Sequence, residues 1–328
     1  MKRLAYLDVA RALSIILVVI GHYNQHDFPI WYQKSVLGIY TFHIPLFMFV
    51  SGYLYTLTGM EKGYCDLFWK KFRRLMIPYF VVSFIVISIK LLFQGHAYIS
   101  NPVTPQSYLR MFCLPEAGYY LWFVWSLWSM FVIVPFFKTK GQRLLLFFLA
   151  VALQMMPLPE VDLFCLSQTK NNLVYFMLGV MASDHRERLV PLGRVPLVFY
   201  FMAFLSVEFL YAFFPQSMGR FTLLIAFLGI TFMIQLSKCL VQKGGKMMVF
   251  CLMSVSSASY VIYLFHTTFE GFAKAVIHKM DGVVDCSQMP FFLLGFVFVV
   301  TLGIWMPILL NDWVLKRYKT TRFLFGLK

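Results

Sequence analysis

The chain has 328 residues, of which 60% are apolar and 13% are charged, and its mean hydropathy is +0.73. An ordinary soluble domain carries about 25% charged residues, so this composition excludes an ordinary soluble globular protein. The formal net charge of +15 would suggest a nucleic-acid partner unless the placement of the cations has another explanation.

Ten apolar runs are long enough, or nearly so, for helices that cross a bilayer, which takes about 20 residues. Alternating strands of about ten residues, the signature of a membrane barrel, are absent from the sequence. We therefore predict an all-α, polytopic membrane helix bundle with about ten transmembrane helices, in one domain over residues 1–328 and without a fused soluble domain. The expected spans are 4–23, 39–58, 75–94, 119–137, 144–156, 172–184, 195–214, 221–237, 250–272 and 290–310.

The distribution of Lys and Arg orients these spans. One set of loops holds Lys2 and Arg3, a basic run at residues 70–74, and the basic tail from Lys316 to Lys328. Cytoplasmic loops of membrane proteins are enriched in Lys and Arg, so both termini are expected in the cytoplasm. This asymmetry explains the net charge, and no nucleic-acid partner is expected. The opposite loops carry only Lys34, Arg110, Lys170, Arg220, Lys274 and Lys279.

The remaining general features give no competing signal. The start of the chain imitates a secretory signal but lacks a small-x-small cleavage site, so we expect a retained first helix. The cysteines show no C-x-x-C pair and no zinc-type spacing, which predicts neither a disulfide framework nor a zinc site. They are Cys65, Cys113, Cys165, Cys239, Cys251 and Cys286.

The first span carries three ionisable side chains, Asp8, Arg11 and His22, in an otherwise apolar run. At ~100° and ~1.5 Å per residue, Arg11 and His22 come about 20° apart in azimuth and about 16 Å apart along the helix axis. An ionisable group at the centre of a membrane helix costs ~2.5–3.5 kcal/mol on insertion scales, so both are expected to face protein or water. We interpret this face as the functional stripe.

Within this stripe, His22 is the best candidate for a general base, because an imidazole titrates near neutral pH and can accept a hydroxyl proton. Arg11 lies three residues after Asp8, and an ion pair between them near the inner interface is an alternative explanation for its presence. The two interpretations are compatible, because a carboxylate can hold a guanidinium in place for an anionic ligand.

Three histidines are expected at similar depth near the outer surface: His22, His43 on the second span and His266 on the ninth. A lone interfacial histidine is usually a hydrogen-bonded structural residue, and this interpretation is open for His43. His266 and Glu270 are four residues apart and could share a proton or a metal. Because no third ligand is apparent, we expect no metal site.

The basic run Lys70-Lys71-Phe72-Arg73-Arg74 precedes the third span. Topology and attraction to anionic lipid, at ~1 kcal/mol per residue, explain most such clusters. The functional interpretation is a cytoplasmic mouth that binds phosphate groups, with Lys71 and Arg74 on one helix face.

Two further positions have a structural and a functional interpretation. Glu208 lies inside the seventh span, where an acid is either a functional group that binds an acceptor or the partner of a cation such as Lys90. The aromatic run 119–123, which includes Trp122, begins the fourth span at the outer interface. Interfacial aromatic belts and stacking against a sugar both account for such a run.

Taken in order, these motifs resemble the acyltransferase-3 family of integral membrane acyltransferases. The first-helix pattern is an Arg and a His with ten residues between them, and the second-helix pattern ends in Ser-Gly. The match extends over nearly the whole chain. The residues that carry it are Tyr6–Ala12 with His22, Phe42–Leu54, Arg74-Leu75, Pro78-Tyr79, Leu121–Phe123, Tyr260, Tyr263-Leu264 and His266.

The resemblance implies transfer of an acyl group, commonly acetyl, from cytoplasmic acyl-coenzyme A to a hydroxyl of a sugar, glycan or lipid-linked acceptor. It also implies a multi-pass protein of a bacterial-type cytoplasmic membrane, in contact with membrane lipid. His22 would then be the catalytic base, and Arg11 a partner for the donor or for the geometry of the site.

The same resemblance implies that Lys71, Arg73 and Arg74 bind the phosphates of acyl-coenzyme A. The family often has arginine where this chain has Lys71, and lysine lacks the bidentate fork. The thioester oxyanion needs a hydrogen-bond donor, for which Ser51 and Tyr263 are both candidates. Substrate contacts are expected from His43, Ser51, Trp122, Glu208, Tyr263 and His266.

Two other functions stay open. Ten helices with buried Arg, His and Glu would also suit a transporter or flippase for a glycolipid or small anion. A non-catalytic relative that only binds a partner is the other alternative. The sequence contains no G-x-S-x-G, H-E-x-x-H or G-x-G-x-x-G motif, so hydrolase, metalloprotease and nucleotide-fold functions have no support.

Overall fold

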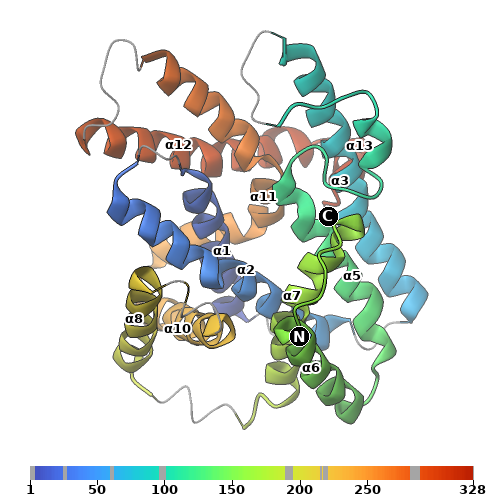
Figure 1. The fold of residues 1–328 in the computed structure, drawn as a ribbon, viewed down its shortest axis with the longest axis vertical. Coiled ribbons are helices and arrows are strands. Elements are labelled where there is room, and N and C mark those ends of the chain that lie inside the picture. Colours follow the sequence, from blue (N-terminus) through green and yellow to red (C-terminus); the bar gives the residue numbers. More distant parts are fainter. Residues whose placement is uncertain are drawn as a thin grey trace. The chain divides into compact units, whose positions relative to one another are not determined.

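The computed structural model describes residues 4–24, 28–59, 63–95, 101–188, 195–214, 216, 221–280 and 289–327. Every regular element in this described part is a helix, and none of it forms a strand (Figure 1). The all-α prediction is therefore confirmed. Five residues named above for charge or spacing lie outside the described residues: Lys2, Arg3, Arg220, Cys286 and Lys328.

Among the described residues, seven helical segments are long and apolar enough to cross a membrane, as expected of a multi-pass membrane protein. Another helix, α8 (Leu197–Phe213), is apolar but shorter, and α6 (Lys140–Met155) and α7 (Leu166–Asp184) also coincide with expected spans. The seven are α1 (Ala5–His22), α2 (Ile30–Thr58), α3 (Tyr64–Phe93), the segment Tyr119–Phe136 that contains α5 (Trp122–Ile133), α10 (Thr222–Lys243), α11 (Lys246–Met280) and α12 (Met289–Leu310).

The structure divides into two compact units, which are described separately. Unit 1 contains Met1–Val50 and Arg186–Asp312, and unit 2 contains Ser51–His185 and Trp313–Lys328. The helix α2 therefore begins in unit 1 and ends in unit 2. The expectation of one domain over residues 1–328 stays a prediction.

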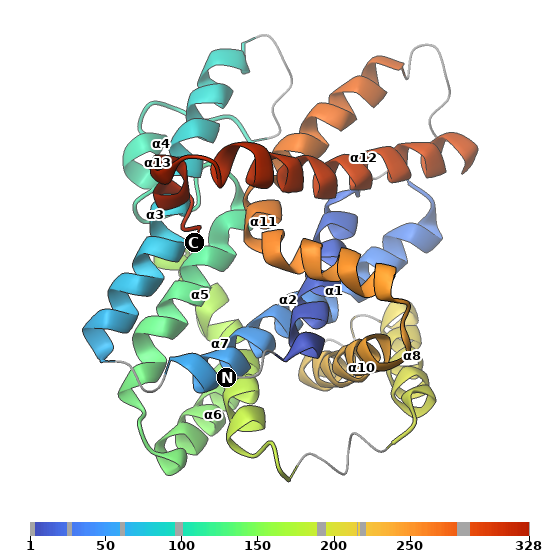
Figure 2. The ribbon, with the colours of Figure 1, turned by 180° about the vertical axis from the view of Figure 1, so that it is seen from behind.

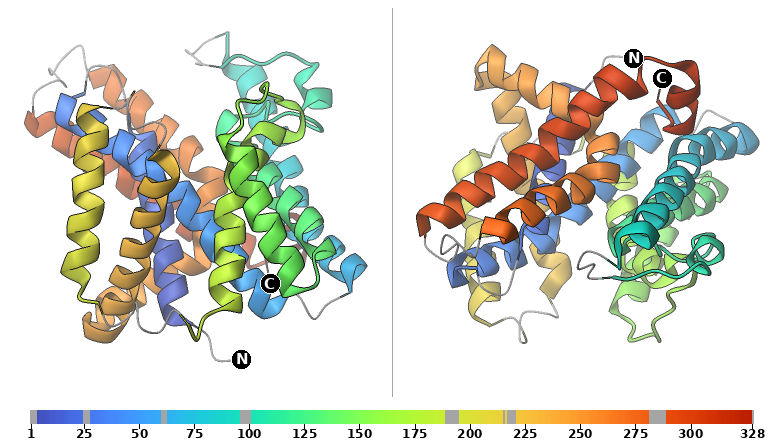
Figure 3. Two further views of the ribbon diagram at one scale, coloured as in Figure 1. Left: turned by 60° about the horizontal axis from the view of Figure 1, so that its bottom comes forward. Right: turned by 90° about the horizontal axis from the view of Figure 1, so that it is seen from above.

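Unit 1 is built around α1, which packs against α10, α11 and α12. Small residues permit this close packing: a Cβ atom at Gly303 of α12 would lie 2.9 Å from Cγ1 of Val19. The helices α8 and α10 lie side by side (Figure 3). Gly229 of α10 leaves room for the side chain of Phe42 on α2, since a Cβ there would lie 2.8 Å from Phe42 Cγ.

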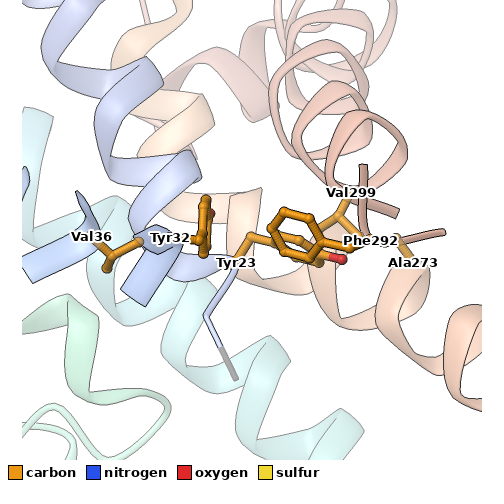
Figure 4. Packing of buried hydrophobic residues seen from close by; sticks show 6 residues of the cluster. All are labelled: Tyr23, Tyr32, Val36, Ala273, Phe292 and Val299. Carbon is orange, nitrogen blue, oxygen red and sulfur yellow. The ribbon is translucent and has the colours of Figure 1, made fainter. Parts of the chain in front are cut away.

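An aromatic cluster packs beside the end of α1 in unit 1 (Figure 4). The Tyr23 ring, just after α1, lies 6.0 Å from that of Phe292 on α12 and 6.3 Å from that of Tyr32 on α2, centroid to centroid. Between membrane helices such contacts stabilise the structure through van der Waals packing. The cluster joins the end of α1 to α2 and α12. Its buried members are Tyr23, Tyr32, Val36, Ala273, Phe292 and Val299.

Unit 2 packs α5 against α3 and α7, with α6 against α7. Gly52, near the end of α2, lies directly against the carbonyl oxygen of Phe176 on α7, where no side chain would fit. A buried ion pair joins α6 to α7: Arg143 Nε lies 2.7 Å from Asp184 Oδ2, and Arg143 also donates to the carbonyl oxygen of Lys138. Because both charges are paired and hydrogen-bonded, the buried ion pair is tolerated.

The short helix α13 (Lys319–Leu324), near the end of the chain, packs against α3 in unit 2 (Figure 2). Gly326 follows the helix at φ 62°, and the Leu327 N–H donates to the carbonyl oxygen of Arg322 at 2.8 Å. This is a glycine C-cap of the Schellman type. A Cβ at Gly326 would lie 2.8 Å from Cα of Arg74, so the turn lies directly on the α3 backbone.

Candidate active site

The first two turns of α1 carry a compact polar network. The Arg11 guanidinium is paired with the Asp8 carboxylate, which confirms the ion pair that their spacing predicted. Arg11 Nε and Nη2 also lie 3.2 and 3.1 Å from Ser256 Oγ on α11. Asp8 is buried and Arg11 is partly exposed, so the carboxylate and the serine hold the guanidinium at an accessible edge of the helix.

At the other end of α1, His22 lies beside His266 of α11. The two imidazole centroids are 4.9 Å apart, and the ring planes meet at 64°. His266 is fully buried, whereas His22 is partly exposed. Tyr263, one helical turn before His266, has its ring centroid 6.2 Å from the His266 imidazole. Three residues predicted from sequence, His22, Tyr263 and His266, therefore lie together.

Backbone carbonyls fix the tautomers of two histidines. His266 Nδ1 lies 2.8 Å from the carbonyl oxygen of Tyr263, and His43 Nδ1 lies 2.7 Å from that of Ile39. Because a carbonyl oxygen only accepts, Nδ1 carries the proton in each case. In the neutral imidazole, Nε2 of His266 and of His43 is then the acceptor nitrogen.

His43 is connected to the end of α1 through Tyr40. The two rings are 5.3 Å apart, and the Tyr40 hydroxyl donates to the carbonyl oxygen of Gly21, directly before His22. The expected gathering of His22, His43 and His266 around one end of α1 is consistent with these contacts.

Lys274 was expected in an outer loop, but α11 continues past it to Met280. Its Nζ donates to the carbonyl oxygen of His22 at 2.7 Å and lies 3.9 Å from Glu270 Oε2. Glu270 is 1% exposed. The sequence indicated Glu270 through its spacing from His266, whereas nothing in the pattern linked Lys274 to His22.

Glu208 of α8 faces α2 rather than standing alone in the apolar helix. Its Oε1 accepts a hydrogen bond from Thr41 Oγ1 at 2.6 Å, and its carboxylate lies against Gly38, where a Cβ would come 2.6 Å from Oε2. Lys90, considered above as its partner, donates to the carbonyl oxygen of Asn101 in unit 2. Glu208 thus joins α8 to α2 at Thr41, which lies two residues before His43.

Unit 2 contains a basic pocket of about 570 Å³ at the start of α3. Two of the predicted phosphate ligands, Arg73 and Arg74, line it, whereas Lys71 places its Nζ 3.4 Å from the Phe131 ring centroid in a cation–π contact. At ~100° per residue Lys71 lies about 60° beyond Arg74 around the helix axis, outside the arc of the lining residues, so Lys71 does not share the pocket face with Arg74, contrary to the expectation. The lining residues are Asp66, Trp69, Lys70, Arg73 and Arg74.

The other two sequence candidates, Ser51 and Trp122, both belong to unit 2. Ser51 lies on the part of α2 that belongs to unit 2, and Trp122 is the first residue of α5; both are partly buried. The described part of the chain contains no group of three His, Cys, Asp or Glu that could hold a metal ion.

Comparison with known families gives a match over nearly the whole chain. The model of the acyltransferase-3 family, described as an acyltransferase domain, matches residues 4–310. This range includes Arg11 and His22 on α1, the basic pocket at the start of α3, and His266 on α11. No solved structure gives a significant match.

Two curated relatives share part of the sequence. Nodulation protein NolL of Sinorhizobium fredii is 29% identical over 159 residues, which is 46% of this chain and 42% of that protein. Nodulation protein NolL of Mesorhizobium japonicum is 26% identical over 137 residues, or 40% of this chain and 35% of that protein. The matches therefore span less than half the length of these relatives.

Proposed function

Because the chain belongs to the acyltransferase-3 family, we propose that it is a membrane O-acyltransferase that uses acyl-coenzyme A as the donor. The acyl group is acetyl, and the acceptor is a hydroxyl of a cell-surface or lipid-linked carbohydrate. The observation that carries this proposal is the pair of imidazoles, His22 and His266, beside the anchored end of a membrane helix that also carries Arg11.

The donor binds first through its phosphates. The pocket at the start of α3 supplies two guanidinium groups, Arg73 and Arg74, and the Lys70 ammonium. Guanidinium groups form charge-assisted, often bidentate hydrogen bonds with phosphate, and these are about twice as strong as neutral ones. With both termini in the cytoplasm, this pocket opens to the compartment that contains acyl-coenzyme A.

The chemical step takes place at His22. Its imidazole removes the proton from the acceptor hydroxyl as the oxygen attacks the thioester carbonyl carbon. The new C–O bond forms, the C–S bond breaks, and the proton on His22 passes to the departing coenzyme A thiolate. A hydrogen-bond donor stabilises the oxyanion, and Ser51 and Tyr263 remain the two candidates. His43, Glu208 and His266 of unit 1 contact the acceptor in this proposal.

The test uses isolated membranes that contain the full chain and labelled acetyl-coenzyme A. The wild type is expected to transfer label into a glycan or lipid fraction, and His22→Ala is expected to lose this transfer at an unchanged protein level. His185→Ala, in the turn after α7, is the matched control and is expected to retain transfer. Equal transfer in wild type and His22→Ala would refute the role of His22. Uptake of a glycolipid or anion without acylation would favour the transporter alternative.

A further inference from the structure

The last three carbonyl groups of α1 each accept a hydrogen bond from a side chain of another helix. Two of the donors are on α2 and one is on α11, and all these residues belong to unit 1. The bonds are Tyr32 Oη to the Ile20 oxygen at 2.9 Å, Tyr40 Oη to the Gly21 oxygen at 2.7 Å, and Lys274 Nζ to the His22 oxygen at 2.7 Å.

These bonds supply hydrogen-bond donors to the carbonyl groups at the C-terminal end of α1. The last four carbonyls of a helix have no i+4 partner within it, although in α1 the Ile20 oxygen also accepts the N–H of Tyr23 at 3.2 Å. Where water does not reach a helix end, other groups of the protein must donate to these carbonyls, because an unsatisfied backbone group is unfavourable in an apolar environment. A lysine ammonium at a helix C-terminus also interacts favourably with the helix dipole. Tyr32, Tyr40 and Lys274, here called the carbonyl clamp, therefore bind the end of α1 to its neighbours.

The clamp leaves α1 little room to shift. A Cβ at Gly21 would lie 2.8 Å from Cε1 of the Tyr40 ring, so that ring lies directly on the helix backbone. Tyr32 is buried in the aromatic cluster together with Tyr23, the residue that follows His22. The side chains that donate the bonds are thus themselves fixed by packing.

Lys274 is held from its other side by Glu270. The carboxylate lies 3.9 Å from the ammonium and is buried against α12, where a Cβ at Gly303 would come 3.1 Å from Glu270 Cγ. His266 precedes Glu270 by one turn of α11. The same helix therefore presents one residue to the imidazole of His22 and another to its backbone carbonyl.

We propose that Tyr32, Tyr40 and Lys274 are positioning residues that hold the His22 imidazole in its place beside His266. This inference rests on the proposed function, because it assigns these residues to the step in which His22 accepts a proton. Misplacing a catalytic group by about 1 Å can cost on the order of 100-fold in rate. Releasing one carbonyl therefore lowers kcat while the binding of the donor stays unchanged.

The experiment removes the clamp one hydrogen bond at a time in the full-length protein. The variants are Tyr32→Phe, Tyr40→Phe and Lys274→Met, with Lys274→Arg as the conservative replacement that keeps a donor. Tyr175→Phe is the control, because that buried hydroxyl bonds Gln154 in unit 2 and not α1. Size-exclusion elution establishes that each variant is folded.

Two measurements are made on each variant. The first is kcat and donor KM for acetyl transfer: each clamp variant is expected to lose about 10- to 100-fold in kcat with KM within about twofold, and Lys274→Arg to recover most of the loss. The second is the rate at which diethyl pyrocarbonate modifies His22, read by mass spectrometry, which is expected to rise several-fold in the clamp variants and not in Tyr175→Phe.

The outcomes separate this inference from the proposed function. Unchanged His22 modification, or unchanged kcat in all three clamp variants of an active protein, would overturn the clamp. A parallel rise in donor KM would overturn it as well, since a general structural defect would have that effect. Faster His22 modification in the clamp variants, with no acyl transfer by the wild type itself, would uphold the clamp and refute the proposed reaction.

Discussion

The imidazole of His22 lies edge to face with that of His266, with centroids 4.9 Å apart, although the two residues are 244 positions apart in the sequence. His266 is the buried partner, and its Nδ1 is bonded to the carbonyl oxygens of Ile262 and Tyr263. Nε2 of the neutral ring is then the acceptor nitrogen. In the proposed function, this contact with His22 assigns His266 to the site of the reaction.

The first prediction concerns this second imidazole. His266→Phe keeps an aromatic ring of similar size but removes both nitrogens, so we expect kcat to fall about 100-fold while donor KM stays constant. Steady-state acetyl transfer at varied acetyl-coenzyme A measures both constants. His185→Phe, at the end of α7, is the matched control. An equal kcat for His266→Phe and wild type would remove His266 from the proposed mechanism.

The second prediction separates structure from function at Arg11. Removing one member of a buried ion pair typically costs about 3–5 kcal/mol, and partial exposure of Arg11 reduces this cost. We expect Arg11→Gln and Asp8→Asn each to lower the thermal midpoint, and the double variant to be less destabilised than the two single effects added together. Additive effects in this double-mutant cycle would show that the pair contributes nothing beyond its separate members.

Ser256 offers a separate measurement at the same network. Ser256→Ala leaves the ion pair in place but removes the hydroxyl that the guanidinium contacts at 3.1 Å. If Arg11 contacts the donor, this change raises the donor KM by about fivefold and has little effect on the thermal midpoint. A lower thermal midpoint with unchanged KM would assign Arg11 to structure alone.

The third prediction follows from the different directions of Lys71 and its neighbours. Arg73 and Arg74 line the basic pocket, whereas Lys71 contacts the Phe131 ring. Arg73→Gln and Arg74→Gln are expected to raise the donor KM about 10-fold or more, since hydrogen bonds to charged groups contribute about 1.5–3 kcal/mol. Lys71→Gln is expected to change KM less than twofold and to lower stability instead. The same rise in KM for all three variants would contradict this assignment.

The fourth prediction concerns the C-cap that supports this pocket. Gly326→Ala adds a Cβ 2.8 Å from Cα of Arg74 and places alanine at φ 62°. The left-handed conformation alone costs about 1–2 kcal/mol for a non-glycine residue. We expect α13 to separate from α3, with faster proteolysis after Lys319 or Arg322 and a raised donor KM. Gly245→Ala is the control, since a Cβ there meets no atom within 4 Å.

Hydropathy placed the centres of the helices correctly but not all of their ends. The expected spans 4–23 and 290–310 agree closely with Ala5–His22 and Met289–Leu310. By contrast, α2 begins at Ile30 instead of residue 39, and α3 begins at Tyr64 instead of residue 75. Their first turns are amphipathic, so the helix continues beyond the apolar run that a membrane criterion detects.

The candidate site was predictable where it depends on spacing within one helix. The separation of three residues predicted the Asp8–Arg11 pair, and the eleven-residue step placed Arg11 and His22 on one face. The contacts of Ser256 with Arg11 and of Lys274 with His22 join α1 to α11, more than 200 positions along the chain. No periodicity in one sequence encodes such a contact, because it depends on how the helices pack.

The last prediction tests the orientation of the chain and the packing of unit 2 through two cysteines. Cys65 is exposed at the start of α3, on the side expected to be cytoplasmic, and Cys165 is buried just before α7. Burial, reinforced by the nearby Asp162 carboxylate, raises the pKa of the Cys165 thiol to about 12. Maleimide reacts with the thiolate, so Cys165 becomes reactive only as the pH rises toward that value.

Single-cysteine variants and a membrane-impermeant maleimide provide the measurement. At about pH 7.5, Cys65 is expected to be labelled in inside-out vesicles and not in right-side-out vesicles. Cys165 is expected to stay unlabelled in both preparations up to about pH 10 and to react after denaturation. Labelling of Cys65 from the outer face would reverse the orientation, and the basic pocket would then open away from the compartment that supplies acyl-coenzyme A.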